Sequence, residues 1–220
     1  FLRADEIQLI EDNGNKLISE LSYLATASNR KKNISTEKVR TIVKRQCFDS
    51  GQFSRNFDNK NQHDCGEFIQ SLLQQLWNNT AIPLNLKENI FGGLSQEVLS
   101  CKCGHTEELP VNNMPEILPI AVKGVNIQTC LANYFSDETV KWKCPRCLES
   151  NASKSVNVIH EPETLLLQMM RFKCSPLDGQ IIKMHNQVIC PIDLQLNSDT
   201  VYTLKCIINH IGSSPQSGHY

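Results

Sequence analysis

The chain has 220 residues, of which 40% are hydrophobic, and its formal net charge is −1. This length is enough for one large domain or two small ones with a real core. The near-neutral charge gives no electrostatic case for binding nucleic acid or an anionic membrane, and no apolar run approaches the roughly 20 residues needed to span a bilayer.

The first half of the chain is predicted to be helical. Residues 6–12, 16–26 and 35–47 carry apolar side chains at helical spacing, with a break at Asn13-Gly14. The clearest helix covers residues 64–78, "DCGEFIQSLLQQLWN", whose apolar residues follow the i, i+3, i+4, i+7 pattern. Asp64 and Glu67 have the spacing of a capping box, with Asp64 as the N-cap.

From Phe91 onward the pattern changes to short strands and turns. One helix, at residues 127–135, interrupts the candidate strands, which cover 139–144, 154–162, 164–172, 180–191 and 201–212. The run 164–169 is nearly continuously apolar, which is typical of a central strand buried on both faces. Helices followed by strands predict an α+β architecture.

The ten cysteines fall into two groups. Four form two tight pairs, "CKC" at Cys101 and Cys103 and "CPRC" at Cys144 and Cys147. The remaining six are scattered among apolar residues, as small buried side chains are: Cys47, Cys65, Cys130, Cys174, Cys190 and Cys206. This pattern favours a reducing compartment, the cytosol or the nucleus, over a secreted disulfide framework.

The two pairs together predict one structural zinc ion held by four cysteines, each pair on its own hairpin. A catalytic zinc is not expected, because four thiolates close the coordination shell. The first pair is one residue shorter than the usual C-x-x-C knuckle, and His105 lies close enough in sequence to replace Cys101 or Cys103 as a ligand. The alternative is four reduced cysteines with no metal.

Four segments, in order along the chain, resemble the ubiquitin-specific protease family of cysteine-dependent deubiquitinases. They are "NQHDCGEFIQSLLQQL", "FGGLSQEVLSCKCG", "EPETLLLQMMRF" and "YTLKCIINHIGSSPQSGHY". The resemblance implies a papain-like cysteine peptidase fold: thumb helices at about 1–91, zinc-bearing fingers at about 92–155 and palm strands at about 156–220. Two positions depart from the family pattern, Glu161 for a leucine and Met170 for a lysine.

The resemblance also implies site residues. His219, in "SGHY", would be the general base, Gly218 would let the substrate backbone approach, and Tyr220 would pack beside the imidazole. Asp64 would pair with an arginine of the ubiquitin tail as well as capping its helix. His210 would either line the same cleft or brace the turn. Trp142, Phe172 and Tyr202 are expected to be core or sheet-surface aromatics.

The family's nucleophile box, Gly-Asn-Thr-Cys-Tyr, does not occur in these 220 residues. We therefore expect a fragment that is incomplete at both ends, with the nucleophilic cysteine upstream of Phe1 and the residue that orients His219 beyond Tyr220. The fragment alone should then be inactive. Two hypotheses follow: an active deubiquitinase that acts on ubiquitin and ubiquitinated proteins, or an inactive zinc-stabilised module that binds ubiquitin or another partner. A zinc-ribbon nucleic-acid binder lacks the basic patch with aromatics that it would need.

Overall fold

The structure, a computed structural model, describes residues 64–78, 89–196, 200–214 and 217–219, together with residues 20, 21, 23 and 41. The chain divides into two compact units: residues 1–90 with 219–220, and residues 91–218. Within the described residues, no helix has both the length and the apolar character needed to span a membrane.

In the first unit the structure describes one long helix, α4, at Cys65–Trp77. This confirms the helix predicted over 64–78. Leu73 and Leu76 on its apolar face are buried, and Asp64 caps its N-terminus. The earlier predicted helices lie outside the described residues, except for four positions that are helical: Glu20, Leu21, Tyr23 and Thr41.

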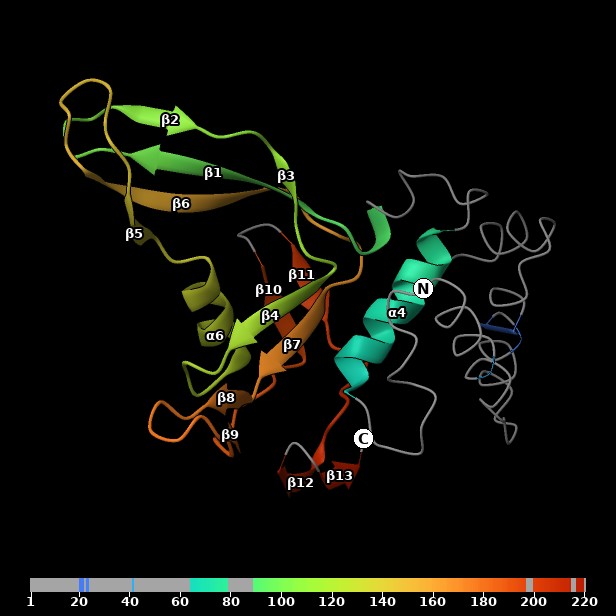
Figure 1. Ribbon diagram of the computed structural model, residues 1–220. Helices are drawn as coiled ribbons and strands as arrows, with labels where there is room; N and C mark the ends of the chain where they lie inside the picture. Colours follow the sequence, from blue (N-terminus) through green and yellow to red (C-terminus); the bar gives the residue numbers. More distant parts are fainter. Residues whose placement is uncertain are drawn as a thin grey trace. The chain divides into compact units, whose positions relative to one another are not determined.

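The second unit is built mainly from strands, as predicted for the chain after Phe91. A five-stranded sheet has the order β2-β1-β6-β5, with β3 also pairing with β1, and every pairing in it is antiparallel (Figure 1). Its strands are β1 (Leu94–Ser100), β2 (Thr106–Glu108), β3 (Asn112–Asn113), β5 (Glu138–Lys141) and β6 (Asn151–His160). Because β6 runs across residue 155, the predicted boundary between fingers and palm falls inside a strand.

A hydrophobic core is assembled from β4 (Ile117–Ala121), α6 (Ile127–Tyr134), β7 (Leu166–Met170) and β10 (Asp193–Gln195). Its buried residues are Met114, Leu118, Ile120, Cys130, Leu131 and Leu194. Asn126 caps α6 by accepting a hydrogen bond from the Thr129 amide at 2.7 Å. The predicted helix at 127–135 is therefore confirmed.

β7 differs from the expectation of a strand buried on both faces. It pairs with β4 in parallel, its only partner among the described strands, and residues 166–169 are half-buried. Leu165, Leu167 and Met169 pack on the core, whereas Met170 is 44% exposed. Alternate side chains of β7 thus point to one buried face. The prediction of a strand buried on both faces, made from the continuous apolar run, is therefore wrong.

Three two-stranded pairings follow along the chain: β8 (Phe172–Cys174) with β9 (Ile181–Lys183), β10 with β11 (Val201–Thr203), and β12 (Ile211–Ser214) with β13 (Ser217–His219). The strand predicted over 201–212 is broken into β11 and β12. Ile207 and Ile208 between them are 54% and 53% exposed. No buried face therefore holds this stretch in a ladder.

Candidate functional site

The four paired cysteines lie in two turns of the five-stranded sheet. Cys101 and Cys103 follow β1 in the turn that leads to β2, and Cys144 and Cys147 lie in the turn between β5 and β6. Because β1 pairs with β6 up to Ser100↔Ser153, and β5 pairs with β6 up to Lys141↔Asn151, both turns leave the sheet at the same end. Each pair therefore sits on its own hairpin, as predicted.

The four sulfur atoms all lie within 4.8 Å of one another. Cys101 Sγ is 3.5 Å from Cys147 Sγ, and Cys103 Sγ is 3.7 Å from Cys144 Sγ. Both distances exceed the roughly 2.05 Å of a disulfide. Tetrahedral zinc with Zn–S bonds of about 2.3 Å places neighbouring sulfurs about 3.8 Å apart. The cluster therefore fits a single tetrahedral ion.

The short first knuckle keeps both of its cysteines in this cluster, so no substitution by His105 is needed. The His105 ring instead stacks on Trp142, with ring centroids 6.0 Å apart and planes at 8°. Trp142 thus lies just after β5 and packs on the His105 ring at the end of the sheet. This agrees with its predicted structural role.

Backbone hydrogen bonds shape each knuckle. The Gly104 amide donates to the Cys101 carbonyl at 2.9 Å, and the Leu148 amide donates to the Cys144 carbonyl at 2.9 Å. Both turns close on a residue in the left-handed region, Gly104 at φ 82° and Leu148 at φ 64°. Glycine adopts this conformation easily, whereas leucine does not. The second knuckle therefore contains a strained residue directly after Cys147.

The surroundings favour a thiolate at the most buried sulfur. Burial opposes ionisation of Cys144, but the backbone amides of Cys147 and Arg146 hydrogen-bond to its sulfur, and the net effect lowers its pKa to about 7. At Cys147 the amide of Glu149 favours the thiolate, yet the neighbouring Cys101 and Cys103 outweigh it and raise the pKa to about 12. Four crowded thiols cannot all ionise without a cation to balance the charge.

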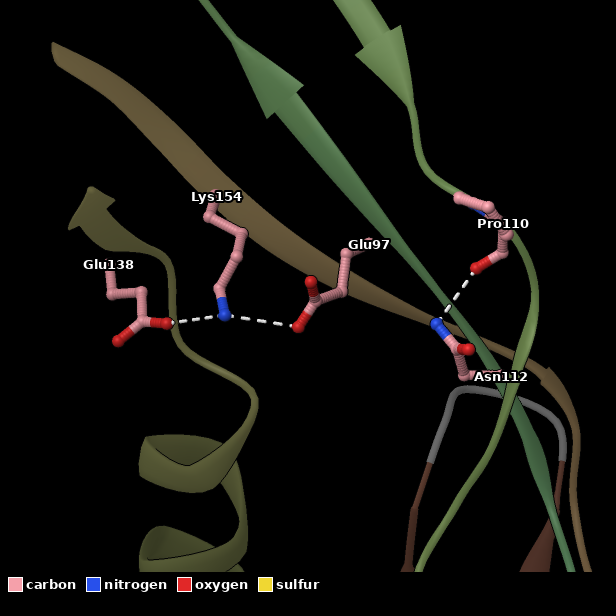
Figure 2. A network of polar contacts seen from close by, with 5 residues as sticks. All are labelled: Glu97, Pro110, Asn112, Glu138 and Lys154. Atoms are coloured by element: carbon pink, nitrogen blue, oxygen red, sulfur yellow. Dashed lines mark hydrogen bonds and ion pairs between the residues drawn. The ribbon is translucent and has the colours of Figure 1, made fainter. Parts of the chain in front are cut away.

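A lysine joins three strands of the sheet that carries the cluster. Lys154 on β6 forms ion pairs with Glu138 on β5 at 2.7 Å and Glu97 on β1 at 3.0 Å (Figure 2). The hydrogen bond to Glu138, followed by the one to Glu97, raises the pKa of Lys154. These side chains are partly exposed, so the network adds modestly to the backbone ladders.

The predicted base, His219, is the last residue of β13 and is exposed. Its strand pairs with β12, and the hydroxyls of Ser214 and Ser217 are hydrogen-bonded at 2.9 Å across the hairpin. Tyr220, its predicted neighbour, lies outside the described residues. The role of His219 stays a prediction.

The structure gives Gly218 a packing role. A Cβ on Gly218 would collide with Nε2 of His210 and would lie 2.5 Å from the carbonyl oxygen of Ile211. The predicted approach of the substrate backbone to Gly218 stays a prediction. Glycine is required at 218 because the His210 ring packs against the backbone there.

His210 makes the contacts of a bracing residue. Its ring meets Phe172 edge to face at 5.7 Å, and its Nδ1 lies 3.0 Å from Lys183 Nζ. Of the two roles left open for His210, these contacts favour bracing the turn. A substrate role for His210 stays a prediction. Lys183 was not singled out in the sequence, because one lysine within a short strand carries no recognisable signal.

Asp64 forms the N-cap of α4. Its Oδ1 accepts hydrogen bonds from the amides of Gly66 at 2.7 Å and Glu67 at 3.2 Å. The capping role is therefore confirmed, and one carboxylate oxygen makes both of these bonds. Its pairing with a ubiquitin arginine stays a prediction.

A family model described as ubiquitin carboxyl-terminal hydrolase matches residues 3–220. The chain belongs to this family. Ubiquitin carboxyl-terminal hydrolase 4 of Arabidopsis thaliana is 31% identical over 106 residues, which cover 43% of this chain and 29% of the relative. Ubiquitin carboxyl-terminal hydrolase 9 of Saccharomyces cerevisiae is 28% identical over 192 residues, which cover 74% of this chain and 26% of the relative. The chain thus spans less than a third of the length of either relative.

Solved structures agree with the membership in this hydrolase family at the level of the fold. A chain of the SAGA DUB module Ubp8/Sgf11/Sus1/Sgf73, with a variant Ubp8 and bound to monoubiquitin, matches with a TM-score of 0.67 and 21% identity. The match covers 83% of this chain and 43% of that chain. A second structure of the module, bound to ubiquitin aldehyde, matches with a TM-score of 0.64 and 19% identity. The mixed α+β fold is therefore that of the family.

Proposed function

We propose that this chain is part of the catalytic domain of a deubiquitinase, which hydrolyses isopeptide or peptide bonds after the C-terminal glycine of ubiquitin. The observation that carries the proposal is the family match, which extends from residue 3 to residue 220 and so includes Gly218 and His219. An inactive relative has no chemical need to retain the "GHY" sequence at positions 218–220.

In the proposed reaction, the imidazole of His219 takes the proton of a cysteine thiol, and the thiolate attacks the glycine carbonyl. The C–N bond then breaks, and the imidazolium gives its proton to the departing amine, which leaves a thioester. Water, deprotonated by the same imidazole, hydrolyses the thioester and regenerates the thiol. The cysteine is proposed to lie upstream of Phe1, because the 220 residues contain no Gly-Asn-Thr-Cys-Tyr box.

We assign the parts of the chain to the family's subdomains: residues of about 1–91 to the thumb, about 92–155 to the fingers and about 156–220 to the palm. Cys101, Cys103, Cys144 and Cys147 would hold a structural zinc ion in the fingers. With four protein ligands, such an ion holds the two hairpin turns together and has no position left for substrate.

The proposed partners are ubiquitin and ubiquitinated proteins. Asp64 would pair with an arginine of the ubiquitin tail, Tyr220 would pack beside the His219 imidazole, and His210 would either contact ubiquitin or brace the turn. Cytoplasm or nucleus is the proposed location, because the paired and scattered cysteines of the sequence favour a reducing compartment. The proteins with similar structures were solved with monoubiquitin and with ubiquitin aldehyde bound, which supports this choice of ligand.

The proposal is tested with the full-length protein and its His219→Ala variant, using a fluorogenic ubiquitin C-terminal conjugate. We expect the full-length protein to cleave it, and we expect His219→Ala to reduce turnover by at least about 10²–10⁴-fold, because the imidazole acts as the base and also activates the thiol. Ubiquitin binding, measured by calorimetry, should survive the substitution. Near-normal turnover of His219→Ala would contradict the role of His219.

The alternative function is a catalytically inactive module that binds ubiquitin or another partner. It is favoured if the full-length sequence has another residue in place of the nucleophilic cysteine. In that case the same calorimetric experiment should still detect ubiquitin binding, and no variant of His219 should alter a turnover that is already absent.

A further inference from the structure

Lys183, the last residue of β9, extends its side chain to the start of β12. Its ammonium donates to the carbonyl oxygen of His210 at 2.9 Å and to that of Gly212 at 2.6 Å. It also lies 3.0 Å from Nδ1 of the His210 ring. The lysine is half-buried, so it has exchanged part of its hydration for these three contacts.

The hydrogen-bonding capacity of the ammonium matches this environment. A protonated lysine has three N–H donors and no acceptor, and Lys183 has three acceptors within 3.0 Å. Two of them are the carbonyls on either side of Ile211. The lysine therefore fixes the course of the main chain where β12 begins.

The same contact favours one tautomer of the His210 ring. An ammonium can only donate, so the hydrogen bond forms when Nδ1 accepts and the ring proton lies on Nε2. Nε2 is also the ring atom that packs against Gly218. The His210 ring is thus held by Lys183 on one side and lies against β13 on the other.

We propose that Lys183 is a positioning residue of the hydrolase. Through the His210 ring and the two carbonyls, it holds the β12–β13 hairpin so that His219, at the end of β13, stays oriented for proton transfer. This inference rests on the proposed function, because it gives Lys183 a role only if His219 is the base. The inference adds a residue of the β8–β9 hairpin to those proposed to act in hydrolysis.

Lys173 provides a matched comparison. It lies on β8, the partner strand of β9, where it pairs with Ile182, and it is exposed. A role that any lysine of this hairpin could fill, such as solubility or protection of a strand edge, would apply to both residues. Only Lys183 reaches β12.

The kinetic test uses full-length protein with Lys183→Met, Lys183→Gln, Lys183→Arg and Lys173→Met. We expect Lys183→Met to lower kcat by about 10²-fold with little change in KM, since a misplaced base impairs the chemical step rather than substrate binding. Lys183→Gln keeps two donors and Lys183→Arg keeps the charge, so both should recover part of kcat. Lys173→Met should match the parent. A normal kcat for Lys183→Met would overturn the inference.

A spectroscopic test does not depend on the stability of any Lys183 variant. In full-length protein labelled with ¹⁵N-histidine, two-bond ¹H–¹⁵N correlations report the ring tautomer, and His210→Gln assigns the signal. We expect the Nε2–H tautomer at neutral pH. The Nδ1–H tautomer would overturn the inference, because a protonated Nδ1 cannot accept from Lys183.

The two proposals can fail separately. If His219→Ala abolishes turnover while Lys183→Met preserves it, the proposed function stands and only the role of Lys183 is wrong. If His219→Ala preserves turnover, His219 is not the base and the role of Lys183 falls with it. If the full-length protein shows no turnover at all, the proposed function itself is wrong.

Discussion

The four-cysteine cluster lies at the end of β1 and β6, which have 7 and 10 residues, whereas the hairpin that carries His219 has strands of 4 and 3 residues. The cluster is assembled from side chains on two adjoining hairpins, and long antiparallel ladders fix its geometry. The short hairpin instead depends on side chains from elsewhere, notably Lys183 and Phe172.

This difference shows two ways of positioning the side chains to which we assign a function. At the cluster, regular backbone pairing brings the sulfurs together, and a metal would reinforce an arrangement that already exists. At the hairpin, few backbone hydrogen bonds are available, so packing of the His210 ring and a half-buried ammonium must replace them. Substitutions at the cluster should therefore change metal binding and stability, whereas substitutions at the hairpin should change turnover.

The largest effect is expected from Cys144→Ser. Serine is a poor zinc ligand, so the variant should lose most of the approximately one equivalent of zinc expected for a four-cysteine site. Because binding of a structural metal contributes directly to folding free energy, the sheet with β5 and β6 should also unfold at a lower temperature. Metal analysis of protein prepared without chelator, together with calorimetry, measures both quantities.

Cys174→Ser is the control for this experiment. Cys174 is exposed on β8, outside the cluster, and its substitution should leave the zinc content unchanged. If the parent protein is folded but contains no zinc, the four sulfurs are reduced thiols and the proposed metal site is wrong.

The second largest effect is expected from Gly218→Ala. The new Cβ would press on the His210 ring and the Ile211 carbonyl, so the hairpin must shift. A displacement of about 1 Å at a catalytic group can cost about 10²-fold in rate. We therefore expect a loss of turnover of this size in the full-length protein, with zinc content unchanged.

Ser213→Ala, at an exposed position on β12 of the same hairpin, is the matched control and should keep its activity. Normal turnover of Gly218→Ala would mean that the hairpin tolerates displacement, and the contrast with the rigid cysteine cluster would disappear.

The smallest effect is expected from Lys154→Met, which removes both ion pairs of the network in Figure 2. Partly exposed pairs contribute about 0.2–1 kcal/mol each, so the free energy of unfolding should fall by no more than about 2 kcal/mol. Chemical denaturation measures this change, and Lys141→Met on the neighbouring β5 is the control. A loss much larger than this would mean that the ion pairs, rather than the backbone ladders, hold the cluster's sheet together.

The sequence predicted best where a pattern has one physical cause. The apolar spacing of residues 64–78 predicted α4, and Asp64 was correctly expected to cap it. The paired cysteines predicted their own cluster, because two close thiols on a turn have few other purposes.

The sequence predicted less where several residues must meet through the fold. The apolar run of residues 164–169 predicted a strand but not its half-exposed packing, since burial depends on which elements cover it. The packing of the His210 ring against Gly218 was not predicted, because the two residues meet only through the fold. Nothing near Lys183 in the sequence indicated that β9 would lie beside the start of β12.

The pairing of β1 with β6 has a consequence for how the molecule folds. Each residue of a strand advances it by about 3.3 Å, and a slip by one position turns every side chain to the opposite face of the sheet. Four sulfurs within 4.8 Å of one another therefore exist only when Ser100 lies opposite Ser153. The cluster therefore depends on the correct strand register. A chain in which β1 and β6 pair in another register has two separate pairs of thiols and cannot enclose an ion.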